Sequence, residues 1–287
     1  MKLNGKIILK GAGLHSGREC ELIIEPCDTP EIIMGNGVDF MPISKFKTNG
    51  TNRGSDYIFT NGDTLRTCEH VLSALAGLDI FSGVKLTVRG GEMPALDGCA
   101  EGVCSEIMKH SDSVNSVNSD SLNAIELTEP IIIYPDHNND KKRFIAAFPS
   151  ENKNLHISYT VEYKYIGCQV FDYTHSPENY IREISRARTF AYESDIEYLR
   201  SHGMALGGSL DNAILITEHE IKASGGLRFH NEFVRHKILD LIGDLASLGK
   251  KINAHIIAFR AGHELHLKLA EKIKNSKLEK LEGRKIS

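Results

Sequence analysis

The chain contains no tryptophan, and its cysteines form no C-x-x-C pair. A zinc site made from paired thiolates is therefore disfavoured. Only 6 of the 287 residues are cysteines, which is too sparse for a disulfide scaffold. We expect reduced thiols of the kind found in a cytosolic protein. The cysteines stand at positions 20, 27, 68, 99, 104 and 168.

Long hydrophobic runs are also missing. The first residues offer only Ile7-Ile8-Leu9, which is shorter than the apolar part of a signal peptide. No run approaches the roughly 18 apolar residues of a membrane-spanning helix. The formal net charge is -4, without a long basic stripe, so nucleic acid is not an expected partner. These features predict a cytoplasmic protein that does not span a membrane, and we expect a monomer.

The composition is that of a globular protein, with 41% hydrophobic and 25% charged residues. Residues 111–123 are rich in Ser, Asn and Asp, which favour turns over regular structure. We interpret this segment as a linker between an N-terminal domain of residues 1–110 and a C-terminal domain of residues 124–287. Strands and helices mix in both halves without strict alternation, which favours an α+β architecture.

Hydrophobic periodicity predicts the following elements. The expected strands are Lys6–Lys10, Cys20–Glu25, Val84–Arg89, Ala124–Leu127, Ile131–Tyr134, Phe144–Phe148, Leu155–Tyr163 and Asn253–Phe259. The expected helices are Thr67–Ala76, Ala100–His110, Asn179–Arg188, Ser194–His202, Asn231–Leu248 and His263–Lys274. Thr67 is a candidate N-cap of its helix, and Gly77 stands where a C′ glycine would end it.

The helix expected over Asn231–Leu248 contains residues of metal-binding types at a regular spacing. His236, Asp240 and Asp244 recur at i, i+4 and i+8, so they share one face. A histidine and an aspartate one turn apart can both reach one cation. This spacing predicts half of a metal site.

The other half is expected at the start of the helix that begins near Thr67. His70 would complete a set of two histidines and one aspartate, which leaves a fourth tetrahedral position open for water. Imidazole ligands favour Zn²⁺ or Fe²⁺ over Mg²⁺. Cys68 would point about 200° away from His70 on a helix, so we reject it as a ligand. Glu69 could reach a bound water as a general base, or simply complement the helix dipole.

His263 opens the last helix and is a candidate general acid. A helix N-terminus disfavours the charged imidazole, so a carboxylate partner is needed, and Asp244 is the candidate. His266 lies one turn further on and ranks well below His263 for this role. Thr189 could donate to an oxyanion, although it could equally cap a helix. Gly207-Gly208-Ser209 lacks the ending of a phosphate-binding P-loop.

Several ordered motifs together resemble one family, the zinc-dependent UDP-3-O-acyl-N-acetylglucosamine deacetylases of lipid A biosynthesis. The motifs extend over nearly the whole chain: Gly13-Leu14-His15-Ser16-Gly17, Thr67 to Leu78, Pro94-Ala95-Leu96-Asp97-Gly98, Ser185-Arg186-Ala187-Arg188-Thr189-Phe190, Leu206-Gly207-Gly208-Ser209, Leu227-Arg228-Phe229, His236 to Asp244 and Gly262-His263.

The resemblance implies two domains of similar β-α-α-β topology, each a sheet layered against helices, with the active site between them. It implies Zn²⁺ as the cofactor, with Fe²⁺ suited to the same ligands. The implied ligands are His70, His236 and Asp240. The implied reaction groups are the base Glu69, the acid His263 with its partner Asp244, and the oxyanion donors Thr189 and Lys237.

The implied reaction is hydrolysis of the 2-acetamido group of UDP-3-O-acyl-N-acetylglucosamine by water. An insert near residues 191–210 would provide the passage for the acyl chain. The implied substrate contacts are Phe190, Tyr163, Ile196, Gly208 and Ser209. Where members often show Asp-Phe-x-His-Pro, this chain has Glu162-Tyr163-Lys164-Tyr165. Two alternatives stay open: a zinc amidohydrolase for another N-acyl amino sugar, and a catalytically silent binding protein.

Overall fold

The computed structural model describes residues 1–51, 53–112, 124–136 and 142–283. These residues form a mixed α+β fold, as predicted. Most of the expected linker, residues 113–123, lies outside the described residues. Its first two residues, Ser111 and Asp112, are not linker but the short strand β10, which pairs with β1 (Lys2–Leu3).

The first large sheet has the strand order β2-β3-β9-β4-β5. Its strands are β2 (Ile7–Ala12), β3 (Glu19–Pro26), β9 (Val84–Arg89), β4 (Ile33–Gly35) and β5 (Phe40–Pro42). Alternation along β3 sends Leu22 and Ile24 into the core. Glu21 and Glu25 lie on the opposite face, where they form ion pairs with lysines of β2 and its preceding turn. The face of this sheet that carries Leu22 and Ile24 therefore covers the helices.

The second large sheet has the order β12-β13-β19-β14-β15, with β11 beside β19. Its strands are β11 (Ile125–Glu126), β12 (Ile131–Ile133), β13 (Phe144–Pro149), β14 (Leu155–Tyr163), β15 (Gly167–Thr174) and β19 (Ile252–Phe259). In both large sheets two antiparallel hairpins flank a central strand, and one strand of each second hairpin runs parallel to it. The sequence did not predict β4, β5 or β15.

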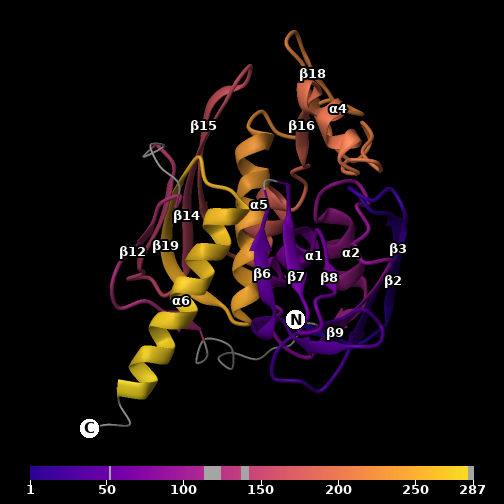
Figure 1. Cartoon of the computed structure of the whole chain (residues 1–287). Coiled ribbons are helices and arrows are strands. Elements are labelled where there is room, and N and C mark those ends of the chain that lie inside the picture. The colour runs from indigo at the N-terminus through magenta and orange to yellow at the C-terminus, as the bar shows by residue number, and fades with distance from the viewer. Residues whose placement is uncertain (52, 113–123, 137–141, 284–287) are drawn as a thin grey trace.

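The long helices other than α4 lie between the two large sheets. Figure 1 shows α5 (Glu232–Leu245) in the centre, with β14 and β19 on one side and α1 (Glu69–Gly77) and α2 (Glu101–Lys109) on the other. Helices α1 and α5 touch closely at Gly243, where a Cβ atom would lie 2.0 Å from the carbonyl oxygen of Glu69. This contact places the first turn of α1 against the polar face of α5. Helix α6 (His263–Gly283) packs on α5 from the other side.

Two smaller sheets flank the helices, and the sequence predicted neither. One contains β6 (Lys47–Gly50), β7 (Ser55–Ile58) and β8 (Thr64–Leu65). The other contains β16 (Phe190–Tyr192), β17 (Ile214–Ile216) and β18 (Ile221–Lys222), and it carries α4 (Glu193–Ser201). In Figure 1 this second group projects above the ends of α1 and α5. The remaining short turns are η1 (Ile43–Lys45) and η4 (Ala246–Leu248).

Two local predictions were wrong. Thr67 does not cap α1: its φ is 55°, and its hydroxyl donates to Glu92, so Cys68 precedes the helix and Gly77 is its last residue. The helix expected over Asn179–Arg188 is instead α3 (Pro177–Asn179) followed by the π-helical turn η3 (Tyr180–Ile184). Among the helices that the structure describes, none has the length and apolarity to cross a membrane.

Candidate metal centre and active site

The contact between α1 and α5 brings three buried side chains together. His70 Nε2 lies 3.6 Å from Asp240 Oδ1, and His236 Nε2 lies 3.3 Å from the same oxygen. The two imidazole rings are 5.1 Å apart, centre to centre. His70 comes from the first turn of α1, whereas His236 and Asp240 are one turn apart on α5. The predicted ligand atoms therefore converge on one point.

The protonation of His236 suits a metal ligand. Its Nδ1 lies 3.0 Å from the carbonyl oxygen of Ala187, which can only accept, so Nδ1 carries the proton. In the neutral ring Nε2 then offers its lone pair toward Asp240. Burial lowers the pKa of His236 to about 3, which keeps the ring neutral at physiological pH.

Asp240 is ionised and only partly satisfied. Burial would raise its pKa, but the positive charges of Lys237 and His263 hold it well below its usual value. Its Oδ2 accepts a hydrogen bond of 2.5 Å from Lys237 Nζ. Its Oδ1 is buried and has no hydrogen-bond partner among the residues that the structure describes. An unpaired carboxylate oxygen inside a protein is costly, and a cation beside it would remove that cost.

These three residues are one of the groups among the described residues whose ligand atoms all lie within 4.8 Å of one another. Two imidazole nitrogens and one carboxylate oxygen are a donor set for a divalent transition metal. The orphaned Asp240 Oδ1 and the free Nε2 of His236 both point into the group. The residues present therefore fit a bound metal.

Glu69 precedes His70 and is almost fully buried, with 2% of its surface exposed. Its Oε2 accepts a hydrogen bond of 3.0 Å from the backbone N–H of Ser55, at the start of β7. Burial raises the pKa of Glu69, although His263 and His70 oppose this effect. A carboxylate with a raised pKa next to a metal site can accept a proton from water.

A second group of buried residues lies one turn further along α5. Oδ2 of Asp244 accepts hydrogen bonds from Nδ1 of His263, at 2.9 Å, and from Nδ1 of His266, at 2.8 Å. Its other oxygen accepts from the hydroxyl of Ser55. The Nε2 of His266 meets the hydroxyl of Tyr159 at 2.8 Å. Asp244 therefore contacts both histidines of α6.

The charge state of His263 follows from this contact. Burial would lower the pKa of His263, but Asp244 and then Asp240 raise it to about 9. Burial lowers the pKa of His266, although it shares the same carboxylate. His263 therefore carries a proton at neutral pH, and its Nε2 faces the metal group, 3.6 Å from Asp240 Oδ2.

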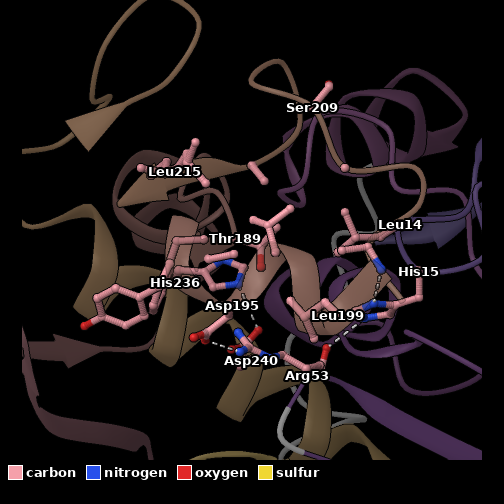
Figure 2. A pocket seen from close by; sticks show the side chains of 18 of the residues that line it. Leu14, His15, Arg53, Thr189, Asp195, Leu199, Ser209, Leu215, His236 and Asp240 are labelled. Atoms are coloured by element: carbon pink, nitrogen blue, oxygen red, sulfur yellow. Dashed lines mark hydrogen bonds and ion pairs between the residues drawn. The ribbon is translucent and has the colours of Figure 1, made fainter. Parts of the chain in front are cut away.

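Thr189 is positioned by a buried ion pair. Arg188 Nε lies 3.0 Å from Glu232 Oε1, and the two side chains are 1% and 0% exposed. Glu232 also accepts the backbone N–H of Arg188, which ties the segment before β16 to the first turn of α5. Thr189 follows directly, so its side chain is held near His236, as Figure 2 shows.

A cavity of about 410 Å³ opens over these residues. Figure 2 shows Leu14, Leu199 and Leu215 in its wall, with Thr189, His236 and Asp240 among its lining residues. Every predicted site residue lines the cavity except Asp244, which lies behind His263. The predicted residues in the lining are Glu69, His70, Tyr163, Thr189, Phe190, Ile196, Gly208, Ser209, His236, Lys237, Asp240 and His263.

Other lining residues were not predicted as site residues. Arg53 and Asp195 both line the cavity and form an ion pair of 2.5 Å between the β6–β7 loop and α4. His15 also lines it, and its Nε2–H donates to the carbonyl oxygen of Arg53 at 3.1 Å. Ser55 lies behind the cavity wall. Isolated polar residues in a hairpin carry no periodic signal, so the sequence alone could not identify Arg53 in the loop or Ser55 at the start of β7.

Comparison with known proteins agrees with this geometry. Residues 1–275 match the family described as LpxC: UDP-3-O-acyl N-acetylglycosamine deacetylase. The chain belongs to this deacetylase family. One relative, the UDP-3-O-acyl-N-acetylglucosamine deacetylase of Campylobacter hominis, is 36% identical over 92% of this chain and 87% of its own length.

Two further members with the same name show a similar relation. The deacetylase of Synechocystis sp. is 36% identical over 94% of this chain and 97% of its own length. The deacetylase of Aquifex aeolicus is 35% identical over 93% of this chain and 90% of its own length. The residues that the family model matches, 1–275, include both large sheets and the helices α1, α2 and α5.

Proposed function

We propose that this protein hydrolyses the 2-acetamido group of UDP-3-O-acyl-N-acetylglucosamine, giving UDP-3-O-acyl-glucosamine and acetate, a step of lipid A biosynthesis. One observation carries this proposal. A two-histidine, one-aspartate group lies at the base of a cavity, with a buried carboxylate and a protonated histidine beside it. Those are the groups that metal-assisted amide hydrolysis requires.

We propose His70, His236 and Asp240 as the ligands of Zn²⁺, with Fe²⁺ suited to the same atoms. A bound cation of this kind supplies Lewis acidity, which lowers the pKa of water and polarises a carbonyl group. The protein contributes a neutral imidazole, a fixed tautomer through Ala187 and an ionised aspartate.

Glu69 acts as the general base in this proposal. Its buried carboxylate accepts the proton of the water that attacks the acetamide carbon. The hydrogen bond from Ser55 N–H fixes one oxygen and leaves the other for the water. As charge develops on the carbonyl oxygen, the hydroxyl of Thr189 and the ammonium of Lys237 lie in the cavity lining to stabilise it.

His263 acts as the general acid. An amide nitrogen leaves only when it is protonated, and His263 carries a proton at neutral pH because Asp244 raises its pKa to about 9. Proton transfer from Nε2 to the departing nitrogen gives the free amine and acetate. Asp244 stabilises the imidazolium and fixes the ring through Nδ1.

The cavity suits a substrate with an apolar chain and a polar head. Ile196 and Phe190 would contact the acyl chain, in a passage formed by the segment near residues 191–210. Tyr163 would lie beside the nucleotide, and Gly208 and Ser209 would contact the substrate near the cavity mouth. All of these residues line the same cavity.

We also propose a two-domain organisation, with residues 1–110 and 124–287 each forming a β-α-α-β unit. The identical strand order of the two large sheets, and the packing of α1 against α5 between them, support this division. The site would then lie at the interface of the two units. We further propose that the protein is a cytoplasmic monomer.

The test measures the release of acetate from UDP-3-O-acyl-N-acetylglucosamine by purified protein whose metal content has been determined. The expected result is turnover of this substrate above that of simple N-acetyl amino sugars. Turnover of another N-acyl amino sugar alone would replace the substrate assignment. Binding of the substrate without any acetate release, by metal-replete protein, would contradict the enzymatic proposal itself.

A further inference from the structure

Ser55 contacts both the proposed general base and the proposed acid pair, and it belongs to none of the sequence motifs. Its backbone N–H donates to Glu69 Oε2 at 3.0 Å. Its hydroxyl donates to Asp244 Oδ1 and lies 3.2 Å from Nδ1 of His263. The residue is fully buried, with 0% of its surface exposed. One small residue therefore contacts the proposed base and the proposed acid pair through two different groups.

The β6–β7 hairpin explains how Ser55 reaches this place. Gly50 at the end of β6 pairs with Ser55 at the start of β7. A Cβ atom on Gly50 would lie 2.5 Å from the carbonyl carbon of His263, so the hairpin approaches the first turn of α6 more closely than a larger residue would allow. A Cβ on Gly54 would lie 3.0 Å from Glu69 Oε1. Two glycines thus bring the hairpin between α1 and α6.

We propose that Ser55 is a positioning residue that holds Glu69 and the Asp244–His263 pair in a fixed relation to each other. The inference rests on the proposed function, because it assigns the backbone N–H of Ser55 to the general base of that reaction and the hydroxyl to the acid pair. The backbone N–H fixes one oxygen of Glu69. The hydroxyl fixes Oδ1 of Asp244, the oxygen to which neither histidine donates.

The physical basis is the number of donors around Asp244. Its Oδ2 accepts from both His263 and His266, and its Oδ1 accepts only the hydroxyl of Ser55 among the described residues. Without that hydroxyl, Oδ1 would lie buried and unpaired, and the carboxylate would turn or recruit water. His263 would then lose its fixed orientation, because its Nδ1 follows Asp244. Removing such a supporting contact typically costs about 10–100-fold in activity.

The test uses Ser55→Ala, which removes the hydroxyl and keeps the backbone N–H. Ser55→Thr restores a hydroxyl at the same position. The matched control is Ser73→Ala: Ser73 is also fully buried, and its hydroxyl lies 2.7 Å from that of Tyr180, away from the site. Each variant is measured as purified, metal-replete protein for kcat, KM, metal content and thermal stability.

In Ser55→Ala we expect kcat to fall by about 10–100-fold, with KM within about threefold and metal content unchanged. Ser55→Thr should recover most of kcat, and Ser73→Ala should keep it. In the His263→Ala background, adding Ser55→Ala should change kcat by less than about twofold, because residues that act as a unit are not additive.

A second measurement does not depend on activity. In metal-free protein labelled with ¹⁵N at histidine, the Nδ1–H resonance of His263 should move in Ser55→Ala and stay in place in Ser73→Ala. If Ser55→Ala does not fold, Ser55→Cys takes its place, because a thiol keeps the volume but donates weakly.

An unchanged kcat and an unmoved His263 resonance in Ser55→Ala would overturn the proposal. An equal loss of kcat in the His263→Ala background would do the same, because the effect would then not pass through His263. Failure of the proposed function is a separate result: wild-type protein would release no acetate, while the resonance test would still report on Ser55.

Discussion

Two buried groups, each built around an aspartate on one of two successive turns of α5, have the same composition, two histidines and one aspartate. The first is His70, His236 and Asp240, and the second is Asp244, His263 and His266. In the first group, one buried oxygen of Asp240 accepts no hydrogen bond from the described part of the chain. In the second, both oxygens of Asp244 accept hydrogen bonds, from Ser55 and from the two histidines. The same residue types thus leave one carboxylate oxygen open to a cation in the first group, whereas both oxygens of Asp244 are already hydrogen-bonded in the second.

The difference decides what each group can do. An unpaired carboxylate oxygen facing free imidazole nitrogens attracts a cation. A carboxylate that already accepts imidazole N–H groups instead raises the pKa of a histidine, here His263, which suits the proposed role of this residue as an acid. The hydrogen bonding of the carboxylate, not the residue types, therefore separates the proposed metal centre from the proposed acid–base pair.

The largest effect is expected where the first group is broken. His236→Ala and Asp240→Ala should each lose the metal, and acetate release should fall by at least about 10³-fold, because the Lewis acid is lost with it. Metal analysis and steady-state kinetics measure both changes. Wild-type metal content in either variant would contradict the proposed ligand set.

His263→Ala should break the second group and spare the first. We expect kcat to fall by about 10²–10⁴-fold, as for the loss of a general acid, with metal content unchanged. The comparison is sharpest when metal content and kcat are measured on the same preparation. Loss of metal in this variant would show that the two groups do not act separately.

Asp244→Asn should have a smaller effect and should change the pH profile. Activity that needs protonated His263 is lost as pH rises through its pKa, so kcat/KM of the wild type should decline near pH 9. The neutral amide no longer raises that pKa, so the decline should move to lower pH. We also expect kcat at its optimum to fall by about 10–100-fold. If kcat/KM of the variant declines at the same high pH as in the wild type, Asp244 does not set the pKa of His263.

Tyr159→Phe should have the smallest effect. The tyrosine hydroxyl lies 2.9 Å from the carbonyl oxygen of Ala261 and 2.8 Å from His266 Nε2, so its loss leaves buried groups unpaired. We expect a loss of about 1–3 kcal/mol in the free energy of unfolding, and a kcat within about fivefold of wild type. Urea denaturation measures the first quantity. A kcat loss as large as that of Asp244→Asn would place His266 in the reaction itself.

Much of the site could be predicted because it follows helical spacing. His236, Asp240 and Asp244 share a face at i, i+4 and i+8 whatever the rest of the fold does. The class of fold was also predictable, since amphipathic strands such as Leu155–Tyr163 and the long α5 stripe need layers to bury them. Short strands were missed, because strands of two to four residues such as β6–β8 are too brief for periodicity to show.

The sequence by itself determined which chemical groups this protein owns and which of them lie on one helix face. Only the tertiary structure decided which carboxylate keeps one oxygen without a hydrogen bond from the described residues and which has both oxygens hydrogen-bonded. That distinction depends on what distant segments bring: His70 of α1 and His263 of α6 lie beside Asp240, whereas Ser55 and the two histidines of α6 donate to Asp244. Spacing along a helix sets direction, whereas hydrogen-bond satisfaction depends on what packs against that face, and packing is a property of the whole fold.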